Sequence, residues 1–597
     1  MPSIVFVIVA LLVFALAYRF YSAFIAAKVL ILDHDRPTPA VKYRDDFDYS
    51  PTNKIVLFGQ HFAAIAGAGP LIGPVLAAQY GFLPGYLWIL IGAVFAGAVH
   101  DMVMLFISIR FDGKSISAIA GEYMNKHVGF VTSLAVLIIL IISMAGLGIP
   151  VVNALYHSPW GVFSVGVTIP IAMFVGIYLK YFRTNRITEG TIIGVALICL
   201  GVFVGPFIAE SFIAPYLNLD VQNLSLILPV YGFLAASLPV WLLLVPRDYL
   251  SSYMKIGVMI ALAVGVIILH PEIKMPMITK FVNGGGPIIP GKVWPFLFIT
   301  IACGALSGFH SIIASGTTCK LLATEKDLRL IGYGAMIFEG FVAIMALIAA
   351  TVLPSADYFA INTVPEVFAK LGMVQEHVGM ISNMVQEDLT GRPGGAVSLA
   401  AGMIYVFHKL KYLDFLMPYF YHFLILFEAL FILTTIDAGT RAGRFLLDNI
   451  LVKAKILKDK QKQSISRIII LSILLSLTWG YLLYTGHVST IWPLFGIANQ
   501  MLASIALALG TTYIISTGKL KYALITLLPW IFVTITTLDA AISSILDNYL
   551  PSGNNILAGM AAALIIMVVI ISIDSILSWI KKAKENYFRQ QASFWND

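Results

Sequence analysis

The stretch GQHFAAIAGAGPLIGP, residues 59–74, lies in an apolar run long enough to cross a bilayer, yet it contains residues that interrupt a helix. Pro70 and Pro74 lack an amide hydrogen, and Gly67 and Gly69 weaken the helix further. Broken backbone at membrane depth has to be buried in protein or to line an aqueous cavity. The stretch therefore predicts a broken membrane helix with a functional interruption.

A second apolar run contains a similar interruption, CGALSGFHSIIASGTT, at residues 303–318. The two runs share a glycine–histidine–glycine spacing. The positions are Gly59, His61 and Gly67 in the first run and Gly308, His310 and Gly316 in the second. Coincidence is the alternative, because the chain has 11 histidines. Broken helices of opposite direction are typical of inverted-repeat transporters, which bind substrate and ion at the interruptions.

The composition around these runs predicts an all-α polytopic membrane protein. Of 597 residues, 59% are hydrophobic and 12% are charged, about half the charged fraction of a soluble protein. Runs of about 20 apolar residues predict about fifteen spanning helices. They are expected at 3–27, 53–78, 84–110, 128–152, 159–182, 190–211, 229–246, 254–270, 294–318, 331–354, 418–447, 467–485, 488–511, 519–545 and 556–580.

The basic residues predict the orientation of the chain. When the connections are assigned alternately to two sides, about 28 Lys and Arg fall on one side and about 7 on the other. The basic side is expected to be cytoplasmic, so the N-terminus lies outside and the C-terminus inside the cell membrane. The net charge of +7 therefore reflects topology and does not indicate a nucleic-acid partner. The first 27 residues have no basic start, which favours a retained helix over a signal peptide.

The expected spans divide into two sets of five, which predict a five-plus-five inverted repeat with extra helices. Residues 355–417 form a long outer segment with a GRPGG turn. We expect the stretch after that turn to be a surface helix, with a lid or re-entrant element as the alternative. The predicted units are 1–52 (first helix and cytoplasmic loop), 53–211 (first repeat), 212–293 (inserted helix pair and outer loop), 294–511 (second repeat, including 355–417) and 512–597 (two C-terminal helices and cytoplasmic tail).

Ionisable and hydroxyl side chains inside predicted spans are candidates for ion coupling. A charge at the bilayer centre costs several kcal/mol, and protonation removes much of that cost. The candidates are His100, Asp101, Glu339, Thr434, Thr435 and Asp437. The candidates for substrate binding lie at the predicted interruptions. They are Gln60, His61, Gly67, Gly69, Ser307, His310, Ser315 and Gly316.

Structural roles are the alternative for each candidate. The histidines could hydrogen-bond neighbouring helices, and His100 could form a structural pair with Asp101. Asp437 could pair with Arg441 one helical turn along. Thr434 and Thr435 could satisfy helix carbonyl groups as easily as coordinate an ion. Arg441 and Arg444 could extend to the cytoplasmic surface.

Other classes of function lack their sequence signals. The three cysteines are isolated, so no metal site is expected, and no organic cofactor is expected either. DGKS at residues 112–115 resembles the end of a P-loop, but Ser108 replaces the first glycine. No HExxH spacing or nucleophile–base pair indicates an enzyme. A proton-translocating subunit of a respiratory complex usually needs mid-membrane lysines, and the predicted spans contain none.

The chain resembles the carbon starvation protein A family. The matching stretches include GQHFAAIAGAGPLIGPVLAAQYG (59–81), CGALSGFHSIIASGTTCKLLATEKD (303–327), DLTGRPGGAVSLAAGM (388–403) and FEALFILTTIDAGTRAGRF (427–445). The resemblance implies a bacterial or archaeal membrane transporter of peptides or pyruvate linked to nutrient starvation. It also implies the LeuT-like five-plus-five fold of the amino acid–polyamine–organocation superfamily.

These observations predict a secondary transporter that imports a small organic solute, a short peptide or a pyruvate-like carboxylate, by proton symport. A sodium-coupled symporter is the nearest rival, and a respiratory proton-translocating subunit is the alternative from another class. The expected partners are the solute and the lipid bilayer, and the coupling ion is H⁺ or Na⁺.

Overall fold

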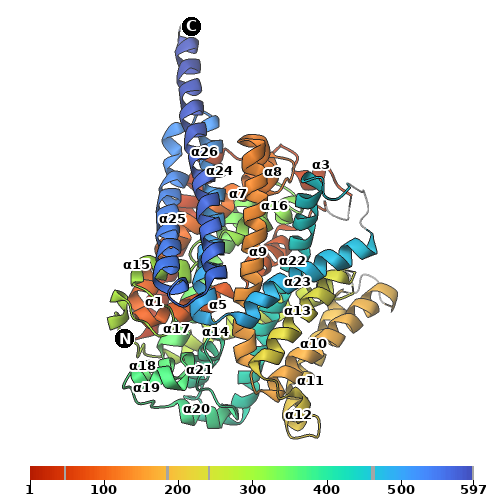
Figure 1. The fold of residues 1–597 in the computed structure, drawn as a ribbon, viewed down its shortest axis with the longest axis vertical. Helices are drawn as coiled ribbons and strands as arrows, with labels where there is room; N and C mark the ends of the chain where they lie inside the picture. Colours follow the sequence, from red (N-terminus) through yellow and green to blue (C-terminus); the bar gives the residue numbers. More distant parts are fainter. Residues whose placement is uncertain (46–48, 183–186, 240–241, 459–463, 595–597) are drawn as a thin grey trace.

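The architecture is a bundle of helices, drawn in Figure 1. The computed structural model describes residues 1–45, 49–182, 187–239, 242–458 and 464–594. Within these residues every regular element is a helix, apart from two isolated bridges. Eleven helical segments are long and apolar enough to cross a membrane, and a bent pair raises the number to 12. The described chain is therefore a polytopic α-helical membrane protein, as predicted.

Most spans are single long helices, and some are continued by π-helical turns such as η4 (Ala93–Gly97) and η9 (Arg329–Gly334). Apolar runs of 20 or more residues explain these lengths, because a helix rises about 1.5 Å per residue. The helices of the spans are α1 (Ser3–Leu16), α6 (Phe82–Gly92), α7 (Ala98–Arg110), α9 (Lys126–Leu155), α10 (Pro159–Ile177), α11 (Ile187–Ala209), α17 (Ala335–Thr351), α22 (Met417–Lys453), α23 (Ile465–Thr485), α24 (Val488–Ser516), α25 (Leu524–Ser543) and α26 (Asn555–Phe594).

The described residues do not confirm the predicted number of about fifteen spans. In place of the predicted span 229–246 lies the shorter helix α13 (Val221–Ser237), and residues 240–241 lie outside the described residues. The span 254–270 falls in α14 (Leu244–Leu269), of which Ile260–Leu269 is a short apolar helix. The span 294–318 is divided into α15 (Val293–Thr300) and α16 (Phe309–Gly316).

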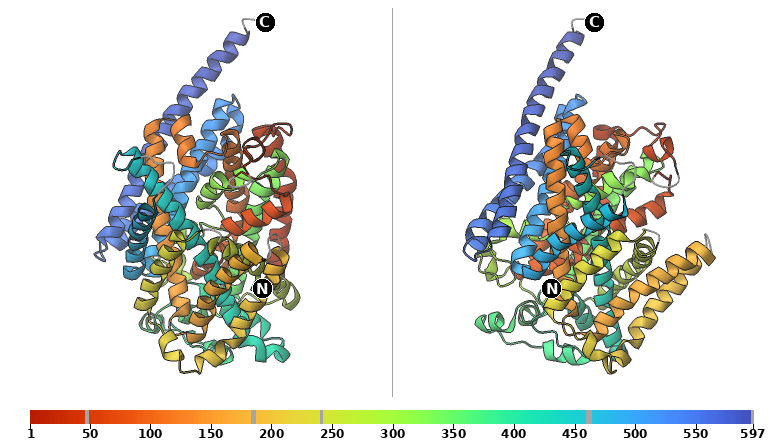
Figure 2. Two further views of the ribbon diagram at one scale, coloured as in Figure 1. Left: turned by 90° about the vertical axis from the view of Figure 1, so that its right-hand side faces the viewer. Right: turned by 45° about the vertical axis from the view of Figure 1, so that its right-hand side comes forward.

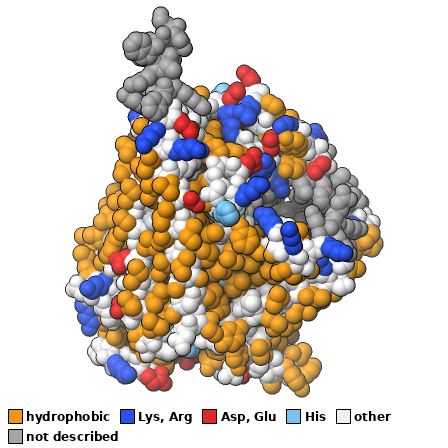
Figure 3. All heavy atoms as spheres, turned by 45° about the horizontal axis from the view of Figure 1, so that its top comes forward, with side chains coloured by type: hydrophobic (Ala, Val, Ile, Leu, Met, Phe, Trp, Pro, Cys, Tyr) orange, Lys and Arg blue, Asp and Glu red, His pale blue; other side chains and the backbone are white. Residues whose placement is uncertain are grey.

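The connections gather at two opposite ends of the molecule, as the alternation of basic residues predicts. At the upper end of Figure 1 lie α3 (Pro39–Lys42), α8 (Ile116–Tyr123) and the C-terminus. At the lower end lie α12 (Ala214–Leu217) and the short helices α18 (Ser355–Asn362), α19 (Pro365–Lys370) and α20 (Val378–Val385). Both views in Figure 2 show α26 projecting past the upper end. Hydrophobic side chains cover much of the face in Figure 3, as a lipid-facing surface requires.

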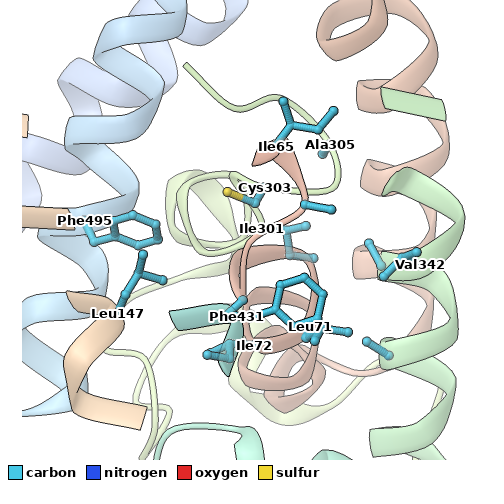
Figure 4. Packing of buried hydrophobic residues seen from close by; sticks show 14 of the residues in the cluster. Ile65, Leu71, Ile72, Leu147, Ile301, Cys303, Ala305, Val342, Phe431 and Phe495 are labelled. Carbon is cyan, nitrogen blue, oxygen red and sulfur yellow. The ribbon is translucent and has the colours of Figure 1, made fainter. Parts of the chain in front are cut away.

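Two broken helices touch at the centre of the bundle. The first consists of α4 (Lys54–Ile65) and α5 (Gly69–Ala77), which are bent by 46° relative to each other in the span that ends at Tyr80. The second consists of α15 and α16. A Cβ atom at Gly69 would lie 2.5 Å from Cys303 Cβ, and one at Gly73 would lie 2.6 Å from the carbonyl oxygen of Thr300. Glycine is thus required for the close approach of the two backbones, and apolar side chains pack around them (Figure 4).

The helix after the GRPGG turn is not on the surface, so that expectation is wrong. This helix, α21 (Ala396–Phe407), packs against α5, α17 and α22. Gly402 contacts the backbone of α17 at Ala349, where a side chain has no room. Gly395 has a φ of +90° and lies against Ile72 of α5. This part of the outer segment is therefore packed inside the bundle and touches the first broken helix.

Candidate functional site

Four ionisable side chains meet beside the interruption of the second broken helix, and we call them the central cluster: His100, Asp101, His310 and Glu339. They come from α7, α16 and α17, and each has 0% exposure. The Nδ1 atoms of His100 and His310 lie 2.7 Å from the two carboxylate oxygens of Asp101. Nε2 of His310 lies 3.1 Å from Oε2 of Glu339. His310 therefore bridges two buried carboxyl groups.

His310 Nε2 and Glu339 Oε2 are close enough to share a proton, although neither atom forms a hydrogen bond among the described residues. A carboxylate oxygen accepts a hydrogen bond, so a contact of 2.7 Å with Asp101 needs the hydrogen on Nδ1 of His310. The ring then meets Glu339 through Nε2. Two atoms without a hydrogen would repel each other at 3.1 Å, and a proton on either one makes the contact favourable. The cluster can thus hold and release a proton inside the bundle.

The interrupted backbone between α15 and α16 is held by polar side chains. The amide of Gly304, where φ is +88°, donates to Oε1 of Glu339 at 3.1 Å. The amide of Phe309, at the start of α16, donates to Oδ1 of Asn499 at 2.9 Å, and the Ser307 hydroxyl donates to the same oxygen at 3.2 Å. Glu339 therefore contacts both His310 and the broken backbone.

The predicted residues of the first interruption lie close to this site. His61 is buried, and its Nδ1 is 2.7 Å from the Thr318 hydroxyl. Gly67 lies in the interruption between α4 and α5, and Gly69 touches the second broken helix. Gln60 is exposed on α4. The structure thus brings Gly67 and Gly69 to the interruptions, together with Ser307, but Gln60 does not join the central cluster.

The second interruption lies in the first part of the predicted stretch 303–318. The irregular backbone is at residues 301–308, whereas the candidate residues Ser315 and Gly316 are the last two residues of α16. Ser315 faces another part of the bundle, where its hydroxyl accepts from the amide of Ile116 at 3.2 Å. The two histidines of the shared spacing are not equivalent in position, because His61 precedes the first interruption whereas His310 follows the second.

Asp437 belongs to a separate buried group, which we call the arginine cluster: Tyr231 of α13, Arg247 of α14 and Asp437 of α22. The Tyr231 hydroxyl donates to Asp437 Oδ2 at 2.5 Å, and an Arg247 guanidinium nitrogen lies 3.6 Å from the same oxygen. Arg441 instead donates to carbonyl oxygens at the end of α13 at 2.6 and 2.8 Å. Arg444 is 2% exposed and does not extend to the surface.

The two threonines near Asp437 make contacts within and between helices. The hydroxyl of Thr435 donates to the carbonyl of Phe431 at 3.1 Å, which is the structural role considered above. The hydroxyl of Thr434 is 3.5 Å from that of Ser251. Neither threonine belongs to the central cluster, so the six predicted coupling residues fall into two groups on different helices.

Sequence reasoning missed two features. Glu428, in the middle of α22, is 3% exposed, and it carries the same signal as Glu339, a lone carboxylate in an apolar run.

At the outer segment, Glu387 and Arg392 form an ion pair at 2.9 Å, which we call the outer pair. Burial raises the pKa of Glu387, although the Arg392 guanidinium opposes that effect. The outer pair lines a pocket of about 510 Å³, whose wall also includes Trp160.

Part of the central cluster has the composition of a metal site. Cys303, His310 and Glu339 present a sulfur, a nitrogen and an oxygen within 4.8 Å of one another. Cys303 Sγ is 3.4 Å from Ser307 Oγ, whereas His310 Nε2 and Glu339 Oε2 face each other without a hydrogen bond. The absence of a metal or organic cofactor stays a prediction.

A bundle of apolar spans in which two broken helices lie beside buried ionisable groups is typical of membrane transporters. Within that class, the chain belongs to the family described as carbon starvation protein CstA, whose model matches residues 2–540. The chain is 47% identical to the "Peptide transporter CstA" of Bacillus subtilis over 599 residues, which is 99% of this chain and 100% of the relative.

Other relatives carry two different solute names. The "Pyruvate/proton symporter BtsT" and the "Peptide transporter CstA" of Escherichia coli are each 46% identical, over 89% of this chain and 80% of the relative. Among solved structures, a manganese transporter mutant from Eremococcus coleocola aligns with a TM-score of 0.44 at 13% identity, over 87% of this chain and 94% of that one. The chain is thus a member of a transporter family, and the names of its relatives point away from an enzyme.

Proposed function

We propose that the chain imports a small organic solute, a short peptide or a pyruvate-like carboxylate, together with a proton. The observation that carries the proposal is the position of His310, between Asp101 and Glu339 and next to broken backbone. The relative named as a pyruvate/proton symporter supports proton coupling, and those named as peptide transporters support the alternative solute.

The central cluster links the proton to the backbone through Glu339. One oxygen of this carboxyl group accepts from the Gly304 amide and the other faces His310. Loss of the shared proton leaves His310 Nε2 and Glu339 in repulsion and favours their separation, which pulls on the segment between α15 and α16. A shift of this kind favours one of two arrangements of the broken helix, as alternating access requires.

The solute would bind where the two broken helices cross. The N-terminal ends of α5 and α16 carry partial positive charge, which favours a carboxylate group. Gly67 at the first interruption is only partly buried, so its backbone is accessible to a ligand, whereas Gly69 is packed against Cys303. Ser307 and His310 provide polar groups at the second.

A LeuT-like five-plus-five repeat forms part of the proposal. Each half contains a broken helix, and each next span contains a π-helical turn, η4 or η9, that precedes a buried carboxylate. These carboxylates are Asp101 and Glu339, which both contact His310. We place the upper end of Figure 1 in the cytoplasm because of its basic residues, so the N-terminus is outside and the protein lies in the cell membrane.

The test is uptake of labelled pyruvate and of a labelled dipeptide into proteoliposomes, with a proton gradient and, separately, a sodium gradient. We expect accumulation to follow the proton gradient and to disappear in Glu339→Gln and in Asp101→Asn. Glu272→Gln is the matched control, because that side chain is 63% exposed. Accumulation that follows the sodium gradient would show that the coupling ion is sodium and not a proton. Unchanged uptake in both variants would show that the central cluster has no role in coupling.

A further inference from the structure

One face of α22 connects the outer pocket with the first interruption. Tyr421, Glu428 and Thr435 are spaced by seven residues, so their side chains point in nearly the same direction along the helix. A Cβ atom at Gly67 would lie 3.4 Å from the Thr435 hydroxyl, which places the upper end of this face at the interruption between α4 and α5.

The other end of the face reaches the outer pair. Tyr421 interacts electrostatically with Arg392, Glu387 and Glu428. The outer pair lines the pocket of about 510 Å³, together with two further acidic residues, Glu210 and Asp388. Glu428 therefore lies between the pocket and the crossing of the broken helices, two helical turns from each of its neighbours on this face.

Glu428 differs from the other deep carboxyl groups in having no partner. In the part of the chain that the structure describes, it forms no hydrogen bond or ion pair, and its Oε1 is fully buried. Asp101 contacts two histidines, Glu339 contacts His310 and the Gly304 amide, and Asp437 contacts Tyr231 and Arg247. A buried carboxyl group without a partner is costly, and it indicates a ligand that supplies the missing donor.

The charges near the two ends of this face indicate the chemistry of that ligand. Three acidic residues and one arginine line the pocket, so the pocket favours a solute with a cationic group over a simple anion. Beyond Glu428, the N-terminal ends of α5 and α16 favour an anionic group. A zwitterionic solute satisfies both regions in one orientation, with its amino end toward Glu428.

We infer that Glu428 binds the ammonium group of a zwitterionic solute, such as a short peptide, and so selects it over monoanions such as pyruvate. This inference rests on the proposed transport function, but it concerns recognition and not the coupling ion. Apolar neighbours of the same helix, such as Phe431 beside Leu71 and Ile72 (Figure 4), offer contacts to a peptide side chain.

The test measures equilibrium binding to the purified full chain by titration calorimetry, in the absence of any gradient. The ligands are Ala-Ala, N-acetyl-Ala-Ala, which lacks the ammonium group, and pyruvate. We expect the original chain to bind Ala-Ala at least tenfold more tightly than the other two. Glu428→Gln should lose that preference, Glu428→Asp should keep part of it, and Glu272→Gln should keep all of it.

The outcomes separate recognition from transport. Three outcomes would each overturn the inference. The preference for Ala-Ala could survive in Glu428→Gln, or folded Glu428→Gln and Glu428→Asp could lose the binding of all three ligands equally. The original chain could also bind pyruvate more tightly than Ala-Ala. Binding with the expected preference, but without gradient-driven uptake in proteoliposomes, would support Glu428 and contradict the proposed symport.

Discussion

The central cluster and the arginine cluster both contain a buried carboxylate that the sequence marks as a coupling candidate, but their partners differ. Asp101 and Glu339 share a histidine, a side chain that can both accept and release a proton. Asp437 pairs with Arg247, whose guanidinium stays protonated. A permanent charge fixes its partner, whereas a titratable one can release it. The comparison favours a coupling role for the first group and a structural role for the second.

The largest effect is expected from Arg247→Met, which leaves Asp437 without its cationic partner. Removing one member of a buried ion pair costs about 3–5 kcal/mol of unfolding free energy, whereas replacing both members is much less costly. Chemical unfolding in detergent should therefore show that Arg247→Met/Asp437→Leu recovers most of the loss. The double variant should also retain proton-driven uptake. If a stable double variant lost this uptake, Asp437 would be part of the proton-coupling mechanism.

The next effect concerns His310, the shared member of the central cluster. His310→Gln keeps a polar side chain but cannot carry the proton, so uptake driven by a pH gradient should fall about 100-fold, the size of a strong coupling free energy. Exchange of solute without a gradient should fall much less, because it needs no net proton transfer. Equal losses in both assays would indicate that His310 only supports the fold.

A smaller effect is expected where the two broken helices touch. Gly73→Ala places a Cβ atom 2.6 Å from the Thr300 carbonyl oxygen, and overpacking of this kind costs about 1–3 kcal/mol. Gly559→Ala in α26 is the matched control, since nothing lies within 4 Å of a Cβ atom there. Thermal unfolding should separate the two variants, and equal midpoints would contradict the close approach.

The smallest effect is expected at the outer pair, a third type of carboxyl environment. Burial raises the pKa of Glu387, so the folded chain holds a proton that the unfolded chain has released in the pH range above 4.5. Stability should therefore fall as the pH rises through that range. Unfolding should be followed at several pH values, and in Glu387→Gln the unfolding free energy should no longer change over this pH range. An unfolding free energy of the original chain that rises over this range would show that the pKa of Glu387 is lowered and not raised.

Local signals in the sequence explain what was predicted correctly. Pro70 and the glycines around it interrupt a helix wherever it lies, and the first interruption is found beside them. Repeated apolar runs likewise predict long helices. Run length alone cannot show that the run at 294–318 is divided into two short helices, so the number of spans was not confirmed.

The contacts of the site depend on packing between distant segments. Asp101 and His310 are 209 residues apart, and no local pattern joins them. Asp437 has an arginine one helical turn away in the sequence, yet the fold pairs it with Arg247. Within the predicted stretch 303–318, the sequence did not show that the irregular backbone lies around Gly304, whose φ is positive, and not at Ser315 and Gly316.

The contact between Gly395 and Ile72 has a mechanical consequence. The outer segment is anchored to α5, so a tilt of α5 at its interruption would displace the loop that carries Arg392. The opening of the outer pocket would then widen or narrow when the central cluster gains or loses a proton. A fluorescent label on that loop would therefore report, from the surface, which arrangement the first broken helix has adopted.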